Sequence, residues 1–288
     1  MFAAACCGGG LSLPGLVTGD DRGQLSLSLA ASDVSAEALP GGERIARGLG
    51  DREWRQSVRL DAAWLLTDRW QAGIAVPVVR RSRSRAGGSA DSAGLGDVAA
   101  TVAYEALPEW SYSSWRPRAL VFLQASLPTG ISPYESVAQY RVDVRGTGFF
   151  SLGAGAAVMK SGRSWDWSLT AEGHRALSRR VLVADEPVDA RPGWGSSVGL
   201  AGGWSPGAGP VRLGASLAAK WDEATQLALE DLPPASGRAG YALGLHVSYL
   251  PTPDVTVSVA LSDETLLGGS NVALGRGVVV LVQHRWAR

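Results

Sequence analysis

The sequence predicts an all-β fold, a closed antiparallel transmembrane β-barrel of about twelve strands with long extracellular loops and short periplasmic turns. Three features predict it. Apolar and polar residues alternate with a period of two along segments long enough to cross a bilayer. The connections between these segments are alternately long and short, and aromatic residues lie at the segment ends.

Composition excludes several other classes of protein. Among 288 residues, 27 Lys and Arg balance 27 Asp and Glu, so the net charge is zero and nothing favours a nucleic-acid partner. Hydrophobic residues make up 45% of the chain, but no apolar run approaches the roughly 18 residues that a membrane helix needs. Good helix-forming surface residues are scarce beside 37 glycines and 11 tryptophans, which favours an all-β chain.

Residues 1–23 are expected to form a flexible leader or the remnant of a secretion signal, before a barrel over residues 24–288. Three alanines precede Cys6, as at the small-residue end of such a signal. Cys6 and Cys7 are adjacent and therefore poorly placed for a disulfide. They are candidates for a lipid or for a metal shared with a partner, and the alternative is a leader without chemistry. The leader is expected to hang in the periplasm, where it could contact a partner protein, or to enter the lumen from below.

The first predicted strands alternate clearly. Residues 24–32 place leucines on one face and serines on the other. Residues 55–65 place arginine, serine and aspartate on one face, opposite tryptophan, valine and leucine. A tight hairpin joins them to residues 70–78, which carry an apolar row from Trp70 to Val78.

Later segments continue the pattern. Residues 95–107 set Val98 and Val102 against Asp97 and Glu105, whereas residues 118–127 are apolar on both faces, so their phase is open. The remaining predicted strands each carry one apolar row opposite small or polar residues: 148–159, 165–173, 194–204, 211–221, 241–250, 255–262 and 277–286.

The connections alternate in length, as in bacterial barrels, whereas a soluble sandwich has no reason to keep this alternation. An even number of strands puts both termini in the periplasm. The predicted long loops cover 33–53, 80–94, 128–145, 176–192, 222–238 and 264–275. The predicted short turns are 66–69, 160–164, 205–209 and 251–253, with a medium connection at 108–116.

Aromatic residues mark both ends of the predicted strands, as expected for girdles at the level of the lipid headgroups. The residues next to the short turns are Trp64, Trp70, Tyr104, Trp165, Trp167, Trp204, Tyr249 and Trp286. Those next to the long loops are Trp54, Trp194, Trp221 and Tyr241.

Several short motifs add a family resemblance. The segment Ser92–Val98 reads SAGLGDV before an alternating strand, Leu127–Gly130 reads LPTG, and Thr147-Gly148 opens the strand that follows. Together with the hairpin at 66–69 they resemble the outer-membrane family of phenol-degradation (MetA-pathway) transporters, over about residues 55–175. The resemblance implies a barrel that passes small hydrophobic or aromatic compounds.

The lumen is the candidate functional site. Twelve tilted strands imply a backbone radius of about 12 Å, which side chains narrow to a small pore or close with salt bridges. An alternative is that the charges inside only pair and hold the barrel together. The predicted pore-lining residues are Arg55, Arg59, Asp61, Asp97, Glu105, Asp166, Glu172, Arg212, Lys220 and His246.

Catalysis is weakly supported. His246 has Ser248 on the same strand face and His174 follows Glu172, but no GxSxG motif and no metal-ligand spacing such as HxxxH or CxxC is present. We expect no enzyme, no cofactor and no metal centre. The predicted function is an outer-membrane channel or transporter for small solutes, surrounded by outer-membrane lipid. The alternatives are a scaffold barrel for periplasmic proteins and, third, an outer-membrane hydrolase.

Overall fold

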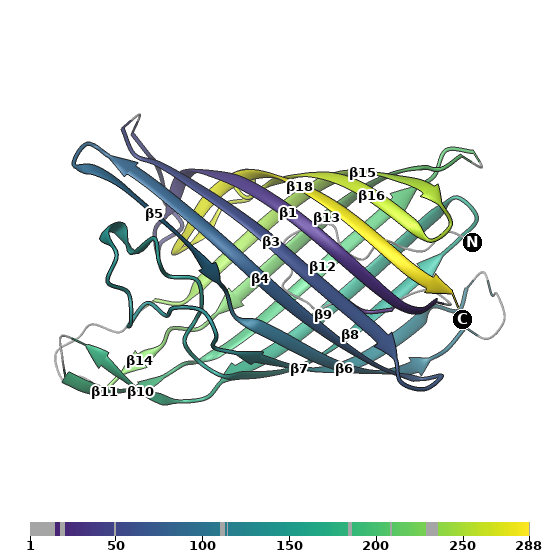
Figure 1. Cartoon of the computed structure of the whole chain (residues 1–288), viewed down its shortest axis with the longest axis horizontal. Coiled ribbons are helices and arrows are strands. Elements are labelled where there is room, and N and C mark those ends of the chain that lie inside the picture. The colour runs from purple at the N-terminus through teal and green to yellow at the C-terminus, as the bar shows by residue number, and fades with distance from the viewer. Residues whose placement is uncertain are drawn as a thin grey trace.

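The chain forms a closed barrel of twelve long antiparallel strands (Figure 1). The computed structural model describes residues 15–17, 21–48, 50–109, 113, 115–183, 186–207, 209–228 and 236–287. Each long strand pairs with the long strands before and after it, and β1 pairs with β18 to close the barrel. Closure removes the strand edges, whose hydrogen bonds lipid cannot satisfy. The predicted fold class is confirmed. The twelve strands are β1 (Asp21–Ala38), β3 (Arg52–Leu65), β4 (Trp70–Arg85), β6 (Val98–Leu107), β7 (Arg118–Leu127), β8 (Ser151–Ser161), β9 (Trp165–Ala176), β12 (Trp194–Trp204), β13 (Val211–Asp222), β15 (Arg238–Thr252), β16 (Val255–Asp263) and β18 (Val272–Ala287).

The outer surface of the barrel is an apolar band. Leu27 on β1 and Leu245 on β15 are exposed, whereas Ser26 on the opposite face of β1 is buried. The structure also settles the phase of β7, because Leu120 and Phe122 are buried inside while Val121 and Leu123 face outward. An outer surface with this much exposed apolar area is typical of a barrel whose strands are surrounded by lipid tails.

Aromatic pairs lie at both ends of this band. At the short-turn end, the ring centroids of Trp64 and Trp286 are 5.8 Å apart and those of Trp70 and Tyr104 are 5.0 Å apart. At the other end, Trp221 lies 6.1 Å from Tyr241. These positions agree with the two predicted girdles.

The two ends of the barrel differ. Asp21 pairs with Ala287, so β1 begins and β18 ends at the end with the short turns (Figure 1). Following the architecture of bacterial barrels, we call this the periplasmic end and the opposite one the extracellular end. The short connections there are 66–69, 108–117, 162–164, 205–210 and 253–254.

Strands reach further at the extracellular end than the sequence predicts. β1 continues to Ala38 and β3 begins at Arg52, so the loop predicted over 33–53 is shorter. Most of the loop predicted over 80–94 is a hairpin between β4 and β5 (Gly88–Leu95). These extensions lie beyond the lipid, so their outward-facing residues need not be apolar. Backbone hydrogen bonds between the strands continue there although the apolar row, which marked the strands in the sequence, has ended. The strand predicted over 95–107 is interrupted at Gly96 and Asp97, and the one predicted over 148–159 begins at Ser151.

Small elements lie at the extracellular end. β10 (Arg179–Val183), β11 (Glu186–Arg191) and β14 (Gln226–Leu227) form a separate three-stranded sheet. Its apolar side packs Val181 and Ala190 against Phe149. The other short elements are β2 (Arg44–Ala46), β17 (Gly269–Ser270) and a 3-10 helix at Gln139–Arg141. Among the described residues, no helix is long and apolar enough to span a membrane.

Candidate functional site

The connection between β7 and β8, loop 128–150, is anchored to the start of β6 by Asp97. The Asp97 carboxylate accepts hydrogen bonds from the Gly130 and Thr147 N–H groups at 3.1 and 2.7 Å, and from the Thr147 hydroxyl at 3.1 Å. The Thr129 hydroxyl donates to the Gly96 carbonyl at 2.5 Å. A Cβ on Gly146 would lie 2.1 Å from an Asp97 oxygen, so any other residue there would push this carboxylate out of its position.

This anchor explains the motifs that carry the family resemblance. Leu127–Gly130 and Thr147-Gly148 are the two ends of loop 128–150, and Gly96-Asp97 is the point where both attach. Asp97 was predicted to line the pore. Its carboxylate is taken up by three donors of loop 128–150, because the strand breaks at this residue and the loop folds back onto it.

A second carboxylate, Asp143, holds the middle of the same loop. It accepts hydrogen bonds from the Ser136 hydroxyl at 2.5 Å and from the Val137 and Ala138 N–H groups at 3.0 and 3.1 Å. Burial alone would raise the pKa of Asp143. The hydrogen bonds stabilise its charged form more strongly, so its pKa lies below the ordinary value.

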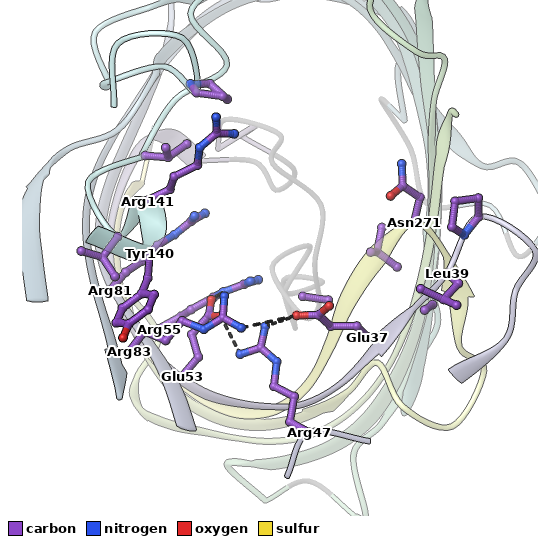
Figure 2. A pocket seen from close by; sticks show the side chains of 17 residues that line it. Glu37, Leu39, Arg47, Glu53, Arg55, Arg81, Arg83, Tyr140, Arg141 and Asn271 are labelled. Carbon is purple, nitrogen blue, oxygen red and sulfur yellow. Dashed lines mark hydrogen bonds and ion pairs between the residues drawn. The ribbon is translucent and has the colours of Figure 1, made fainter. Parts of the chain in front are cut away.

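Loop 128–150 presents two strained residues to the lumen. Tyr140 and Arg141 have φ values of 58° and 53°, a left-handed conformation that is uncommon without glycine. The Tyr140 ring lies 5.5 Å from the guanidinium carbon of Arg85, and Arg141 extends into the lumen (Figure 2). Strain of this kind persists only where the surroundings enforce it, and it is concentrated at functional sites.

These residues border a cavity of about 400 Å³ inside the extracellular half of the barrel, which we call the vestibule. Figure 2 shows Arg55, Arg81 and Arg141 reaching into it from one wall. The opposite side is apolar in part. The other lining residues are Glu37, Ala38, Leu39, Pro40, Arg47, Glu53, Arg83, Pro133, Tyr140, Val142, Val144, Asn271, Val272 and Ala273.

Ion pairs neutralise part of this charge. Glu53 accepts a hydrogen bond from Arg47 at 2.7 Å and from Arg55 at 2.8 Å, and it lies 3.8 Å from Arg83. Asp51 pairs with Arg83 at 2.9 Å. Arg47 and Arg83 are therefore balanced by carboxylates, whereas Glu53 is shared among three guanidinium groups.

Apart from Asp97, the predicted pore-lining residues outside the vestibule are each paired with another charged or titratable side chain. Arg59 pairs with Asp61 at 2.7 Å, and Glu105 pairs with Arg118. The other pairs are Arg212 Nε with Asp166 at 2.7 Å, Arg212 with His246 at 2.6 Å, Glu172 with His174 at 3.3 Å and Lys220 with Asp222 at 3.3 Å. Of the predicted set, Arg55 alone lines the vestibule.

The described part of the leader, residues 15–17, lies inside the periplasmic half of the lumen. Val17 is 1% exposed; its N–H donates to Gln71 Oε1 at 2.6 Å and its carbonyl accepts from Gln71 Nε2 at 3.2 Å. Leu16 packs against Leu120, Ala157 and Met159. Of the two placements predicted for the leader, these residues adopt the one in the lumen. Cys6 and Cys7 lie outside the described residues.

The candidate catalytic histidines are engaged elsewhere. Ser248 accepts a hydrogen bond from Ser258 at 2.8 Å, and His246 contacts Arg212 rather than that serine. His174 lies between Glu172 and Asp222, 3.3 Å from each. Within the described ranges, no group of three or more His, Cys, Asp or Glu residues could hold a metal ion.

Several lumen residues were missed at the level of sequence. Arg81 and Arg83 fell inside the loop predicted over 80–94, although the alternation from Gln71 continues through RRSRSR and puts both on the inner face. No local pattern indicates Arg141, because the fold of loop 128–150 alone brings it to the vestibule.

Solved structures show what this chain is similar to. The outer membrane channel COG4313 from Pseudomonas putida F1 has a TM-score of 0.72 at 14% identity, over 92% of this chain and 96% of that one. The NanC porin has a TM-score of 0.49 at 7% identity, over 90% and 98%. The β domain of the Bordetella autotransporter BrkA has a TM-score of 0.48 at 13% identity, over 92% and 100%.

No protein-family model matches the sequence, and no curated protein is significantly similar to it. The likeness to the Pseudomonas channel shows the fold, and the outer-membrane barrel implied by the family resemblance is confirmed at that level. Closure, the apolar outer band and this likeness together place the chain in an outer membrane, with its exterior in lipid.

Proposed function

We propose that this protein is a passive outer-membrane channel for small solutes. The vestibule carries the proposal, because a cavity of about 400 Å³ with charged walls lies inside a barrel whose exterior is apolar. That volume is in the range of sites that bind small molecules. A barrel that served only as a scaffold would have no need of a polar cavity on its inside.

The solutes we propose are small and at least partly hydrophobic or aromatic. Leu120, Phe122 and Met159 put a buried apolar patch on the inner wall formed by β7 and β8, and Leu16 of the leader packs against part of it, so a solute reaches this patch when the leader shifts. A polar pore ordinarily has polar inner walls. The family resemblance in loop 128–150 and its anchor supports the same class of solute.

Passage toward the periplasm leads past residues 15–17. Gln71, Ser26 and Ser248 in that half are at most 2% exposed although they face the lumen, so side chains and the leader fill this part of the barrel. We propose that the leader narrows the pore and that solutes pass when it shifts. It also remains the segment through which a periplasmic protein could bind.

Single-channel recording of the purified full chain in a planar bilayer tests this function. We expect discrete conductance steps that scale with salt concentration. A silent barrel that copurifies with periplasmic proteins would contradict the channel and favour the scaffold. Lipid or peptide hydrolysis that is lost in His246→Ala would contradict the channel and favour an enzyme. In the structure, His246 contacts Arg212 rather than a serine.

A further inference from the structure

The vestibule wall places like charges directly opposite each other. Arg55 on β3 and Arg81 on β4 are partners in the antiparallel register, and both face the lumen. Directly opposite residues have Cβ atoms about 4.5–5.5 Å apart, and like charges at that distance destabilise a sheet. The next pair along the same face is Glu53 with Arg83, which is complementary. Along this face of the wall, a pair of opposite charges, Glu53 and Arg83, is thus followed by a pair of like charges, Arg55 and Arg81.

Two further arginines reach the same place from loop 128–150. Arg145 donates a hydrogen bond to Ser92, the residue on β5 that is paired with Arg81, at 2.7 Å. Arg55, Arg145 and Glu53 are the charged neighbours of Arg81. Arg141 extends from the left-handed turn toward the same side of the vestibule (Figure 2).

The carboxylates nearby do not match this positive charge. Glu53 is already shared by Arg47, Arg55 and Arg83, and the only other carboxylate that acts on Arg55 among the described residues, Glu264, is shared with no further arginine of this wall. The Nε atoms of Arg81 and Arg145 are buried, and neither has a hydrogen-bond partner among the described residues. A buried donor without an acceptor is costly, so an acceptor supplied by a bound group would stabilise this wall.

We propose that Arg55, Arg81 and Arg141, with Arg145 beside them, bind the carboxylate of a small organic anion in the vestibule. Guanidinium groups bind carboxylates through paired N–H donors. Tyr140, Val142 and Leu39 line the same cavity and provide an apolar surface for the body of the solute. An aromatic carboxylate satisfies both parts of the site. This anion site defines the class of solute for the proposed channel, and its role in transport rests on the proposed channel function.

Binding can be measured apart from conduction. Benzoate, and its neutral analogue benzamide, are titrated by calorimetry into the detergent-solubilised full chain. We expect saturable benzoate binding, little benzamide binding, and at least a tenfold loss of benzoate affinity in Arg81→Gln and in Arg141→Gln. Arg80→Gln is the matched control, because Arg80 precedes Arg81 but lies on the outer face, paired with Asp91. It should bind benzoate as the unchanged protein does.

Recordings in bilayers complete the test. We expect benzoate to interrupt the current of the unchanged channel and of Arg80→Gln, but not of Arg81→Gln. Should Arg81→Gln fail to fold, Arg81→Lys keeps the charge but not the planar fork, and it should bind benzoate more weakly than the unchanged protein but more tightly than Arg141→Gln. Equal benzoate affinity in Arg81→Gln, or benzamide binding as tight as benzoate, would overturn the anion site. A silent barrel that still binds benzoate would overturn the channel and leave the site.

Discussion

Gln71 holds both backbone polar groups of Val17 inside the barrel. Its amide accepts the Val17 N–H at 2.6 Å and donates to the Val17 carbonyl at 3.2 Å. One side chain thus replaces the two bonds that a neighbouring strand would supply. This contact attaches the leader to β4 and puts Leu16 against the apolar inner wall.

Gln71→Ala should therefore raise the conductance of the channel. Each hydrogen bond contributes about 1 kcal/mol, so losing both raises the population of the displaced leader by roughly tenfold or more. Bilayer recordings should show larger or longer open states. Gln56→Ala is the control, because Gln56 lies on the outer face of the neighbouring strand β3 and not in the lumen. Identical open states in the two variants would mean that the leader does not limit the current.

Asp97→Ala should release loop 128–150 without unfolding the barrel. The carboxylate accepts three hydrogen bonds from the two ends of the loop, and hydrogen bonds to a charged acceptor contribute about 1.5–3 kcal/mol each. Brief trypsin treatment should then cut after Arg141 or Arg145 at least tenfold faster. Asp91→Asn, whose aspartate pairs with exposed Arg80, should be cut no faster than the unchanged protein. Protection of the loop in Asp97→Ala would contradict the anchor.

Acid should loosen the turn around Asp143. Because its pKa in the folded loop lies below the ordinary value of 3.8, the carboxylate stabilises the loop above about pH 4. That contribution is lost as the pH falls through the lower folded pKa. Hydroxyl-radical labelling of Tyr140 should increase from pH 6 to pH 2. Asp143→Asn should already be heavily labelled at pH 6, and labelling of the unchanged protein that does not vary with pH would rule out this role.

Asp166→Asn should destabilise the periplasmic half of the barrel. Arg212 is 3% exposed and Asp166 is its carboxylate partner at 2.7 Å, so the change leaves a buried guanidinium without its counter-charge. Loss of one partner of a buried pair costs about 3–5 kcal/mol. When samples are heated to increasing temperatures before gel electrophoresis, the faster-migrating band of the folded barrel should disappear at a clearly lower temperature. Asp189→Asn, which breaks an exposed pair with Arg180, should leave that temperature nearly unchanged, and equal effects would contradict the argument.

Local chemistry specified the barrel wall. Period-two alternation, tight turns such as 66–69 and tryptophans at strand ends act between neighbouring residues or against the lipid, so they are legible along the chain. The twelve strands, the lipid-facing rows and the girdles follow from them. The phase of β7 does not, because both of its rows are apolar and only the leader and β8 explain why Leu120 is the buried one.

The contents of the lumen depend on contacts between distant residues. Alternation predicts that Arg55 faces inward, but the register of β3 against β4 decides that it meets Arg81, and the Asp97 anchor decides that Arg141 joins them. In the same way, Asp166 is neutralised by Arg212 from another strand. A sequence pattern records which face a side chain occupies. Closure of the barrel selects its neighbours on that face, and with them which charges are cancelled and which are left to bind a solute.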